Sequence, residues 1–277
     1  MLGSLQSEAL LSFRHDTERD RTVLHRRRTG GLCHVSKPYW DGTVLGAQVV
    51  NPTAGLFAGD ELRMRVEVGD GARVSLTSPS ASRFHAMGDC GGWVEQEFDV
   101  GAGAWLEFRP DLVIPQGKSR VSQTTRLTVA EGGEVVFFDL LAPGRVAHGE
   151  SYQYQRYSTT LELELGGSLV ARERMVLSPE DGGWPLRVPG WEVSYYGAVW
   201  LVGAGVTTGE EVLAKLERQL DSEGVRIGVS ALTGGVAVVR VLAARSVLLK
   251  NSLSRVREAV EGMFPLLRGG RRTLQNL

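Results

Sequence analysis

Three carboxylates of this sequence occupy positions where the surrounding pattern is apolar. Glu173 has the phase of the apolar side chains in the alternating segment 169–177, and Asp139 lies inside the run 135–141, which is apolar on both faces. Asp60 has the phase of the apolar side chains that follow it. An unpaired carboxylate in an apolar interior costs several kcal/mol or shifts its pKa strongly. Each of these acids therefore needs a partner: an arginine, backbone amides, water or a cation.

Two interpretations of the inward acids are open. The structural one is ion pairing, for instance with Arg109 or Arg145, and Asp60 also has the position of a turn residue before a strand. The functional one is a hydrated polar interior suited to a hard or borderline divalent cation. It is favoured by the small hydroxyl side chains that accompany the acids, namely Thr77, Ser78, Ser80 and Ser82.

Histidine and cysteine offer a weaker metal hypothesis. The five histidines are far apart in the sequence, and it contains no P-loop, G-x-S-x-G elbow, H-E-x-x-H or C-x-x-C signature. His85 and Cys90 are five positions apart in a glycine-containing segment, so they are candidate metal ligands, with an ordinary loop as the competing interpretation. We expect no catalytic residues and no tightly bound cofactor.

The overall composition excludes several classes of protein. The 277 residues include 31 basic and 32 acidic side chains, and the formal net charge of -1 argues against nucleic-acid binding through bulk electrostatics. No apolar run approaches the roughly 18 residues of a membrane span, and the N-terminal segment lacks the apolar core of a secretory signal. Two cysteines cannot form a disulfide framework for a chain of this length. We expect a cytoplasmic protein without a membrane partner.

Glycine and period-two alternation indicate a mainly β fold. Glycine accounts for 35 residues, and apolar and charged residues alternate in segments such as 61–68, 94–100 and 161–165. Glycine turns that begin at residues 69, 101, 132 and 166 separate the segments at intervals of 32, 31 and 34 residues. This weak repeat of strand, glycine turn and strand predicts stacked hairpins in a solenoid-like (β-helix-like) two-layer arrangement.

The pattern changes from strand to helix near residue 207, where Thr208-Gly-Glu-Glu211 resembles a capping box. The elements predicted from there on are a helix from Thr208 to Gly224 with Val212, Leu213, Leu216 and Leu220 on one face, strands at 225–231 and 236–242, and a helix at 246–263. We therefore predict a single domain over residues 1–277 with about two helices near the C-terminus. Segments 1–12 and 268–277 are expected to be flexible.

Four segments resemble the motifs of one protein family. Asn51-Pro-Thr-Ala-Gly-Leu-Phe-Ala-Gly-Asp-Glu-Leu62 is similar to P-x-G-G-L-x-x-G-D-x-L, and 68–78 to the glycine turn and strand that follow it. Segment 108–115 resembles the block P-[DE]-x-x-I-P, and 140–150 resembles L-x-P-G-R-x-A-x-G-E, the most specific of the four. They occur in family order within roughly residues 30 to 265. On these motifs the chain is identified as a member of the family of the urease accessory protein UreD, also called UreH.

The resemblance implies a non-catalytic scaffold in urease maturation. Members of the family form a complex with the accessory protein UreF and the GTPase UreG, and the complex docks on the urease apoprotein while nickel is delivered. The fold implied is a β-rich, helix-poor, solenoid-like stack, in agreement with the strand pattern. An internal, water-filled passage is thought to connect the GTPase side to the urease active site.

The same resemblance suggests roles for individual residues. Asp60, Asp139 and Glu173 look like the acidic residues of such a passage, and Thr77 and Ser80 like polar lining. Arg145 and Glu150 lie in the best-matched block, and we assign them to loop or partner-surface architecture in preference to nickel. Sparse carboxylates would bind Ni²⁺ only transiently, because ligands exchange faster on them than on a closed set of histidines and cysteines.

Two rival interpretations belong to other classes. A β-helix enzyme acting on polysaccharides would combine paired carboxylates with an aromatic groove, for which the candidates are Trp184, Trp191, Tyr195, Tyr196 and Trp200. At strand spacing such aromatic residues are more often part of a core. A β scaffold without any role in metal delivery is the other alternative.

Overall fold

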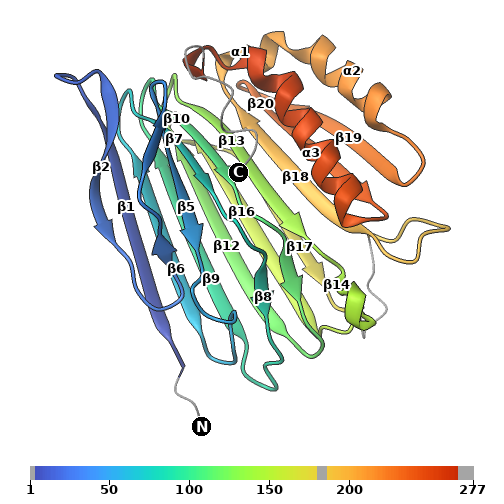
Figure 1. Cartoon of the computed structure of the whole chain (residues 1–277). Helices are drawn as coiled ribbons and strands as arrows, with labels where there is room; N and C mark the ends of the chain where they lie inside the picture. Colours follow the sequence, from blue (N-terminus) through green and yellow to red (C-terminus); the bar gives the residue numbers. More distant parts are fainter. Residues whose placement is uncertain (1–3, 180–185, 268–277) are drawn as a thin grey trace.

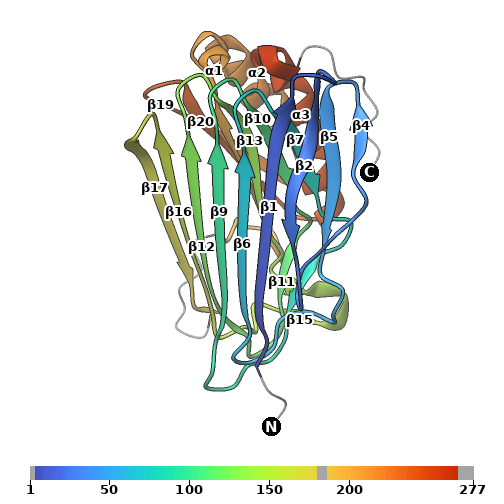
Figure 2. The same ribbon diagram turned by 90° about the vertical axis from the view of Figure 1, so that its left-hand side faces the viewer.

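The computed structural model of the protein describes residues 4–179 and 186–267. It consists of two β layers, with helices packed against one of them (Figure 1). The first layer is a seven-stranded sheet, seen face-on in Figure 2. Its order is β17 (Ser168–Leu177), β16 (Arg156–Leu165), β12 (Arg120–Val129), β9 (Gly92–Val100), β6 (Glu61–Val68), β1 (Gln6–Asp16) and β2 (Arg21–Arg28).

The second layer is an eleven-stranded sheet within the described part of the chain. Its main path is β19 (Val225–Leu232), β20 (Val236–Ala243), β18 (Tyr195–Val202), β13 (Glu134–Leu141), β10 (Trp105–Arg109), β7 (Arg73–Thr77), β5 (Val44–Val50) and β3 (His34–Val35). Three short strands join it beside this path: β4 (Tyr39–Asp41), β8 (Ser82–Phe84) and β11 (Val113–Pro115). A separate ribbon pairs β14 (Gly144–Arg145) with β15 (Glu150–Ser151).

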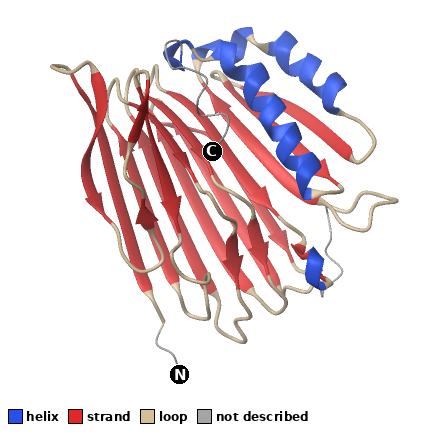
Figure 3. Ribbon diagram, in the orientation of Figure 1, coloured by secondary structure: helices blue, strands red, loops and turns tan. Residues whose placement is uncertain are grey.

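The helices follow in the C-terminal third and pack on the outer face of the eleven-stranded sheet (Figure 3). They are α1 (Ala204–Thr208), α2 (Glu210–Leu220) and α3 (Ser246–Val260), followed by the 3₁₀ turns η3 (Glu261–Met263) and η4 (Pro265–Leu267). Another 3₁₀ turn, η1 (Val146–His148), lies beside β15 at the other end of the molecule (Figure 3). The inward face predicted for the last helix is confirmed, because Leu249, Leu253, Val256 and Val260 are all buried. Among the described residues, no helix has the length and apolar character needed to cross a bilayer.

The glycine turns join the two layers. β6 continues through the turn at Gly69 into β7 of the other sheet, and the steps from β9 to β10 and from β12 to β13 repeat this path. Gly71, Gly103 and Gly132 have φ values of 68°, 61° and 78°, a left-handed conformation that glycine adopts without steric cost. These turns gather at one end of the stack, the turn end, and the longer connections gather at the other, the loop end (Figure 1).

The mainly β, solenoid-like, two-layer fold predicted from the sequence is confirmed, but most of its units are not hairpins. Strands of successive units pair in parallel and in register, as in the row Val68, Val100, Val129 and Leu165. A glycine turn forms a hairpin between β16 and β17. The alternation pattern could not distinguish the two connections, because an arch between layers and a hairpin place the same side chains inward.

Three local predictions are corrected. Residues 6–12 belong to β1, which pairs with β2 and β6, so this part of the predicted flexible segment is wrong. Thr208 ends α1, and its hydroxyl donates to the carbonyl of Gly205 (3.1 Å), so it caps no following helix. Val212 is exposed. Residues 268–277, also expected to be flexible, lie outside the described residues, and the single domain stays a prediction.

Candidate functional site: a polar layer between the sheets

The register of the two sheets brings polar side chains into one layer of the interior. In the seven-stranded sheet the third inward row from the turn end contains Met64, Gln96, Thr125, Leu161 and Glu173. The corresponding row of the eleven-stranded sheet contains Asp139, Ala198 and Arg240. The Glu173 carboxylate forms an ion pair with Arg240, which fixes the two rows opposite each other. We call this set the polar layer.

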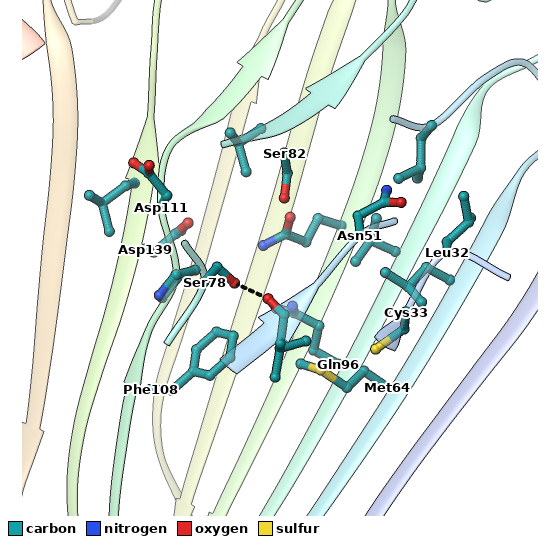
Figure 4. Close-up of a pocket in the computed structure, with 18 of the residues that line it drawn as sticks. Leu32, Cys33, Asn51, Met64, Ser78, Ser82, Gln96, Phe108, Asp111 and Asp139 are labelled. Atoms are coloured by element: carbon teal, nitrogen blue, oxygen red, sulfur yellow. Dashed lines mark hydrogen bonds between the residues drawn. The ribbon is translucent and has the colours of Figure 1, made fainter. Parts of the chain in front are cut away.

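A cavity of about 90 Å³ lies beside Asp139, large enough for several water molecules. Its polar lining includes Asn51, Ser78, Ser82, Gln96, Asp111, Gln123 and Asp139, and Figure 4 shows Asp111, Asp139 and Ser78 at one side of it. Cys33 lies at the other side, and burial raises the pKa of its thiol to about 11. The rings of Phe108 and Phe137 separate the cavity from the apolar core toward the turn end.

Asp139 is the acid with the strongest electrostatic perturbation. Burial is the main cause and the nearby Glu173 carboxylate the second, and together they raise the pKa of Asp139 from 3.8 to about 6. Near neutral pH its carboxyl group therefore exchanges its proton readily. A divalent cation would favour the ionised form, since an opposite charge within a few ångströms lowers a carboxyl pKa.

Glu173 is half-buried and stands at the edge of the polar layer. One oxygen accepts from the Tyr196 hydroxyl (3.3 Å), while the other belongs to the ion pair with Arg240. Burial, followed by the charges of Glu173 and Asp139, raises the pKa of Tyr196. The inward phase predicted for Glu173 is confirmed, but the phase predicted for Leu169 is wrong. A bulge near Leu163 shifts the register of β17, and Leu169 is 50% exposed.

Asp60 is buried, but it does not line the cavity described above. Its two carboxylate oxygens accept from the amides of Leu5 and Phe57, both at 2.8 Å. Its carbonyl accepts from the amide of Trp93 at 3.0 Å. These bonds tie the start of β1, the connection before β6 and the start of β9 together at the loop end. The partner that Asp60 needs is therefore supplied by backbone amides, and its geometry is that of a structural residue.

The two predicted hydroxyl residues are in different environments. Thr77 is buried at the end of β7, and its hydroxyl has no hydrogen-bond partner among the described residues. It lines a second pocket, of about 280 Å³, between α3 and the ends of β7 and β10. Ser80 is exposed in the connection that follows, so the structure places it away from the polar layer.

His85 and Cys90 do not form a metal centre with a third ligand. The His85 ring stacks on Phe57 with centroids 4.3 Å apart, and its Nε2 lies 3.0 Å from the carbonyl oxygen of Ala54. Cys90 is an exposed free thiol. No group of three or more His, Cys, Asp or Glu side chains in residues 4–179 and 186–267 has metal-binding geometry.

Arg145 and Glu150 pair with each other across the β14–β15 ribbon. Arg145 Nε donates to Glu150 Oε2 at 2.8 Å, a second guanidinium nitrogen contacts Oε1, and the amide of Gly117 donates to Oε2 at 3.3 Å. The hydrogen bond from Arg145 is the main reason that the pKa of Glu150 is lowered. Arg145 also lines a surface groove at the loop end together with His85 and His148. This geometry is that of a braced loop.

Several polar residues of the polar layer and of the cavity were not identified from the sequence. Gln96, Gln123 and Thr125 face inward from the seven-stranded sheet, and the hydroxyl of Thr125 donates to Gln96 Oε1 at 3.2 Å. Gln96 has the phase of the apolar residues on its strand, so the test applied to the acids would have found it. Arg240 lies inside the run 236–243, which is otherwise apolar on both faces, so the same test would have marked it as inward. Its partner could not be identified in this way, because Glu173 is 67 positions away.

Two of the aromatic residues proposed for the groove of a polysaccharide enzyme do not face a groove. Tyr196 and Trp200 are buried in the core between the sheets. Trp184 lies outside the described residues. The polar layer and the cavity instead bring carboxylate, amide and hydroxyl oxygens together around a small volume, and these are the groups to which water and hard divalent cations bind.

Fold and site together define a β-solenoid protein with a polar layer and a small cavity in an otherwise apolar interior. The family described as UreD urease accessory protein matches residues 6–272, and the chain belongs to this family. A urease accessory protein UreD of Opitutus terrae is 36% identical over 237 residues, which cover 85% of this chain and 87% of the relative. The UreD protein of Cupriavidus necator is 34% identical over 263 residues, 91% of this chain and 85% of the relative. The UreD protein of Mycolicibacterium gilvum is 34% identical over 200 residues, which cover 72% of this chain and 71% of the relative.

Proposed function

We propose that the chain is a non-catalytic maturation factor of urease. In this proposal it bridges the urease apoprotein to UreF and, through UreF, to the GTPase UreG, and its polar layer provides a passage for nickel. Membership of the urease accessory protein family supports the first part. The second part is supported by the cavity beside Asp139 and by the register that places Arg240 and its ion-pair partner Glu173 in the same layer as Asp139.

The single observation that carries the nickel proposal is the position of Asp139. Its carboxyl group faces a cavity whose polar lining consists of amide and hydroxyl side chains and the Asp111 carboxylate, and its pKa of about 6 allows proton and cation to exchange near neutral pH. A cation enters contact with Asp139 as the proton leaves, and the reverse exchange releases it. Sparse oxygen ligands keep each contact weak, which a conduit needs and a storage site does not.

The far edge of the polar layer provides a second ionisable contact. Glu173 and Arg240 are 27% and 37% exposed at their side chains, so the ion pair closes the layer where it reaches solvent between β17 and β20. A cation that passes here must compete with the guanidinium for the carboxylate. We place this chain in the cytoplasm, where it would meet the urease apoprotein, UreF and UreG.

The test is nickel loading of urease by variants that keep the fold. We expect Asp139→Asn and Glu173→Gln to lower the nickel content of urease activated with UreF and UreG. Co-purification with UreF and the urease subunits should be unchanged. Glu164→Gln is the matched control, because Glu164 is an exposed carboxylate near the end of β16, the strand next to β17.

Each alternative outcome has a separate meaning. Normal nickel content with both interior variants would leave a scaffold without a role in metal delivery. Loss of co-purification would assign these residues to assembly instead of passage. Failure of the wild-type chain to co-purify with UreF or urease would contradict the bridging role itself.

A further inference from the structure

The eleven-stranded sheet is interrupted beside the cavity. β13 pairs with β10 as far as Phe108 and Phe137, and pairing with β11 resumes at Val113 and Leu141. Residues 109–112 therefore stand opposite residues 138–140, and no ladder pairs join these two segments to each other. Pro110 lies in this stretch and has no amide hydrogen to donate. We call this interruption the break.

The break separates two volumes that share part of their lining. The interior cavity lies on one side, and the pocket of about 280 Å³ against α3 lies on the other. Both are lined by Ser78, Pro110, Asp111, Phe138 and Leu140. A continuous hydrogen-bonded sheet would not expose the same residues on its two faces. The wall between cavity and pocket is consequently one residue thick at this place.

An ion pair between the break and α3 closes this thin wall. Lys250 Nζ lies 2.8 Å from Asp111 Oδ1, which also accepts from the amide of Leu112 at 2.7 Å. The Asp111 side chain is 18% exposed, whereas that of Lys250 is 52% exposed on a flexible stem. The lysine can therefore swing into solvent without disturbing α3, which is held by its buried apolar face.

The outer pocket has features of a polar path. The hydroxyl of Thr77 is buried at its wall, with no partner among the described side chains and backbone groups, and Ser254 of α3 lies at its rim. Arg109 and Lys250 also line it, so it carries more positive than negative charge while Lys250 is in place. A cation would be repelled until the lysine leaves and exposes the Asp111 carboxylate.

We propose that the break is a side exit through which a small hydrated divalent cation passes between the interior cavity and the pocket at α3, with the Asp111–Lys250 ion pair holding it closed. The inference rests on the proposed nickel passage and adds a second opening to it. Asp111 exchanges Lys250 for the cation, and Asp139, in the facing segment 138–140, is the next carboxylate on the inner side.

Cys33 provides a readout that does not depend on urease. Its thiol lines the cavity, and Cys90 is the exposed cysteine, so a Cys90→Ser background restricts labelling by methyl methanethiosulfonate to the cavity. Lys250→Ala should raise the labelling rate about fivefold, in line with the modest strength of a half-exposed ion pair. Lys215→Ala, an exposed lysine on α2, is the matched control. A bulky maleimide is the second control. It is too large for the side exit, so any reaction of it with Cys33 measures labelling that occurs through unfolding.

A variant that fills the outer pocket should have the opposite effect. Ser254→Trp places a large ring at the rim on the exposed side of α3, so the fold is retained, and Arg255→Trp is the control next to it. We expect Ser254→Trp to slow labelling of Cys33 and to lower the nickel content of activated urease. Arg255→Trp should change neither.

The outcomes separate the side exit from the proposed function. Labelling that responds to neither Lys250→Ala nor Ser254→Trp overturns the side exit, and the nickel passage survives if Asp139→Asn still lowers nickel loading. Labelling that responds while Ser254→Trp leaves nickel loading normal overturns the exit as a cation route. If Asp139→Asn also left the nickel content of urease normal, the proposed nickel passage itself would be contradicted.

Discussion

The interior has two halves, one toward the turn end and one toward the loop end. Their inward side chains have different roles. Toward the turn end the rows are apolar and the pairing is continuous, with Phe98, Phe108 and Phe137 in mutual ring contact at centroid distances of 4.8 to 5.2 Å. Toward the loop end the next row carries Asp139 and Gln96, and the ladder is interrupted beside them. The first half stabilises the stack, and the second holds the groups that can exchange protons and cations.

Truncating the aromatic contact should have the largest effect on stability. Phe98 is fully buried, and Phe98→Ala should lower the free energy of unfolding by about 3–5 kcal/mol, through lost burial and the cavity left behind. Urea denaturation measures the change. Glu97→Ala, on the outer face of the same strand, is the control. A loss similar to the control would show that this half is not the main source of stability.

Removing the charge of Asp139 should stabilise the fold while impairing nickel delivery. Its pKa is raised from 3.8 to about 6, so ionisation opposes folding: the penalty is absent below pH 3.8, grows as pH rises, and is complete above about pH 6. The free energy of unfolding of Asp139→Asn should therefore exceed that of the wild type by about 2–3 kcal/mol at pH 7.5. The two values should be equal near pH 4. Unfolding curves across this range give the difference. A constant difference at all pH values would contradict the raised pKa.

Asp60 tests whether an inward acid at the loop end is structural. Asp60→Ala leaves the amides of Leu5 and Phe57 without their acceptor and should cost about 2 kcal/mol, whereas Asp60→Asn keeps one carbonyl oxygen and should cost less. A residue that only lined a passage would instead tolerate an apolar replacement without loss of stability. Thermal unfolding of both variants decides between the roles: equal stability to wild type would return Asp60 to the passage.

Charges on the outer face of the seven-stranded sheet should have the smallest effect. Arg126 contacts Glu95, Glu97 and Glu162 on neighbouring strands at 3.1 to 3.8 Å, but its side chain is 52% exposed. Arg126→Met should change stability by less than about 1 kcal/mol, and the change should shrink further in high salt. Urea titrations at two salt concentrations measure both effects. A larger, salt-insensitive loss would indicate that the network is part of the structural core.

The predictions from sequence succeeded where a feature depends on neighbouring residues and failed where it depends on distant ones. Alternation identified β6 at the bounds observed and placed Glu173 inward, because strand phase depends on neighbouring residues alone. It gave the wrong phase for Leu169, where a bulge intervenes, and treated Thr208 as a cap although α1 already includes it. The family resemblance gave Asp60, Asp139 and Glu173 one role, whereas the structure gives them three environments.

By itself the sequence determined the mainly β class, the glycine turns and the inward phase of the acids, since each follows from side-chain period and backbone conformation within a few residues. Only the tertiary structure decided which acid is held by amides, which by Arg240 and which faces a cavity. It alone revealed the break and the ion pair of Asp111 with Lys250, 139 positions later in the chain. Partners so far apart are brought together by the packing of one sheet on the other and of α3 on the outer sheet, and no local pattern records which side chains will then meet.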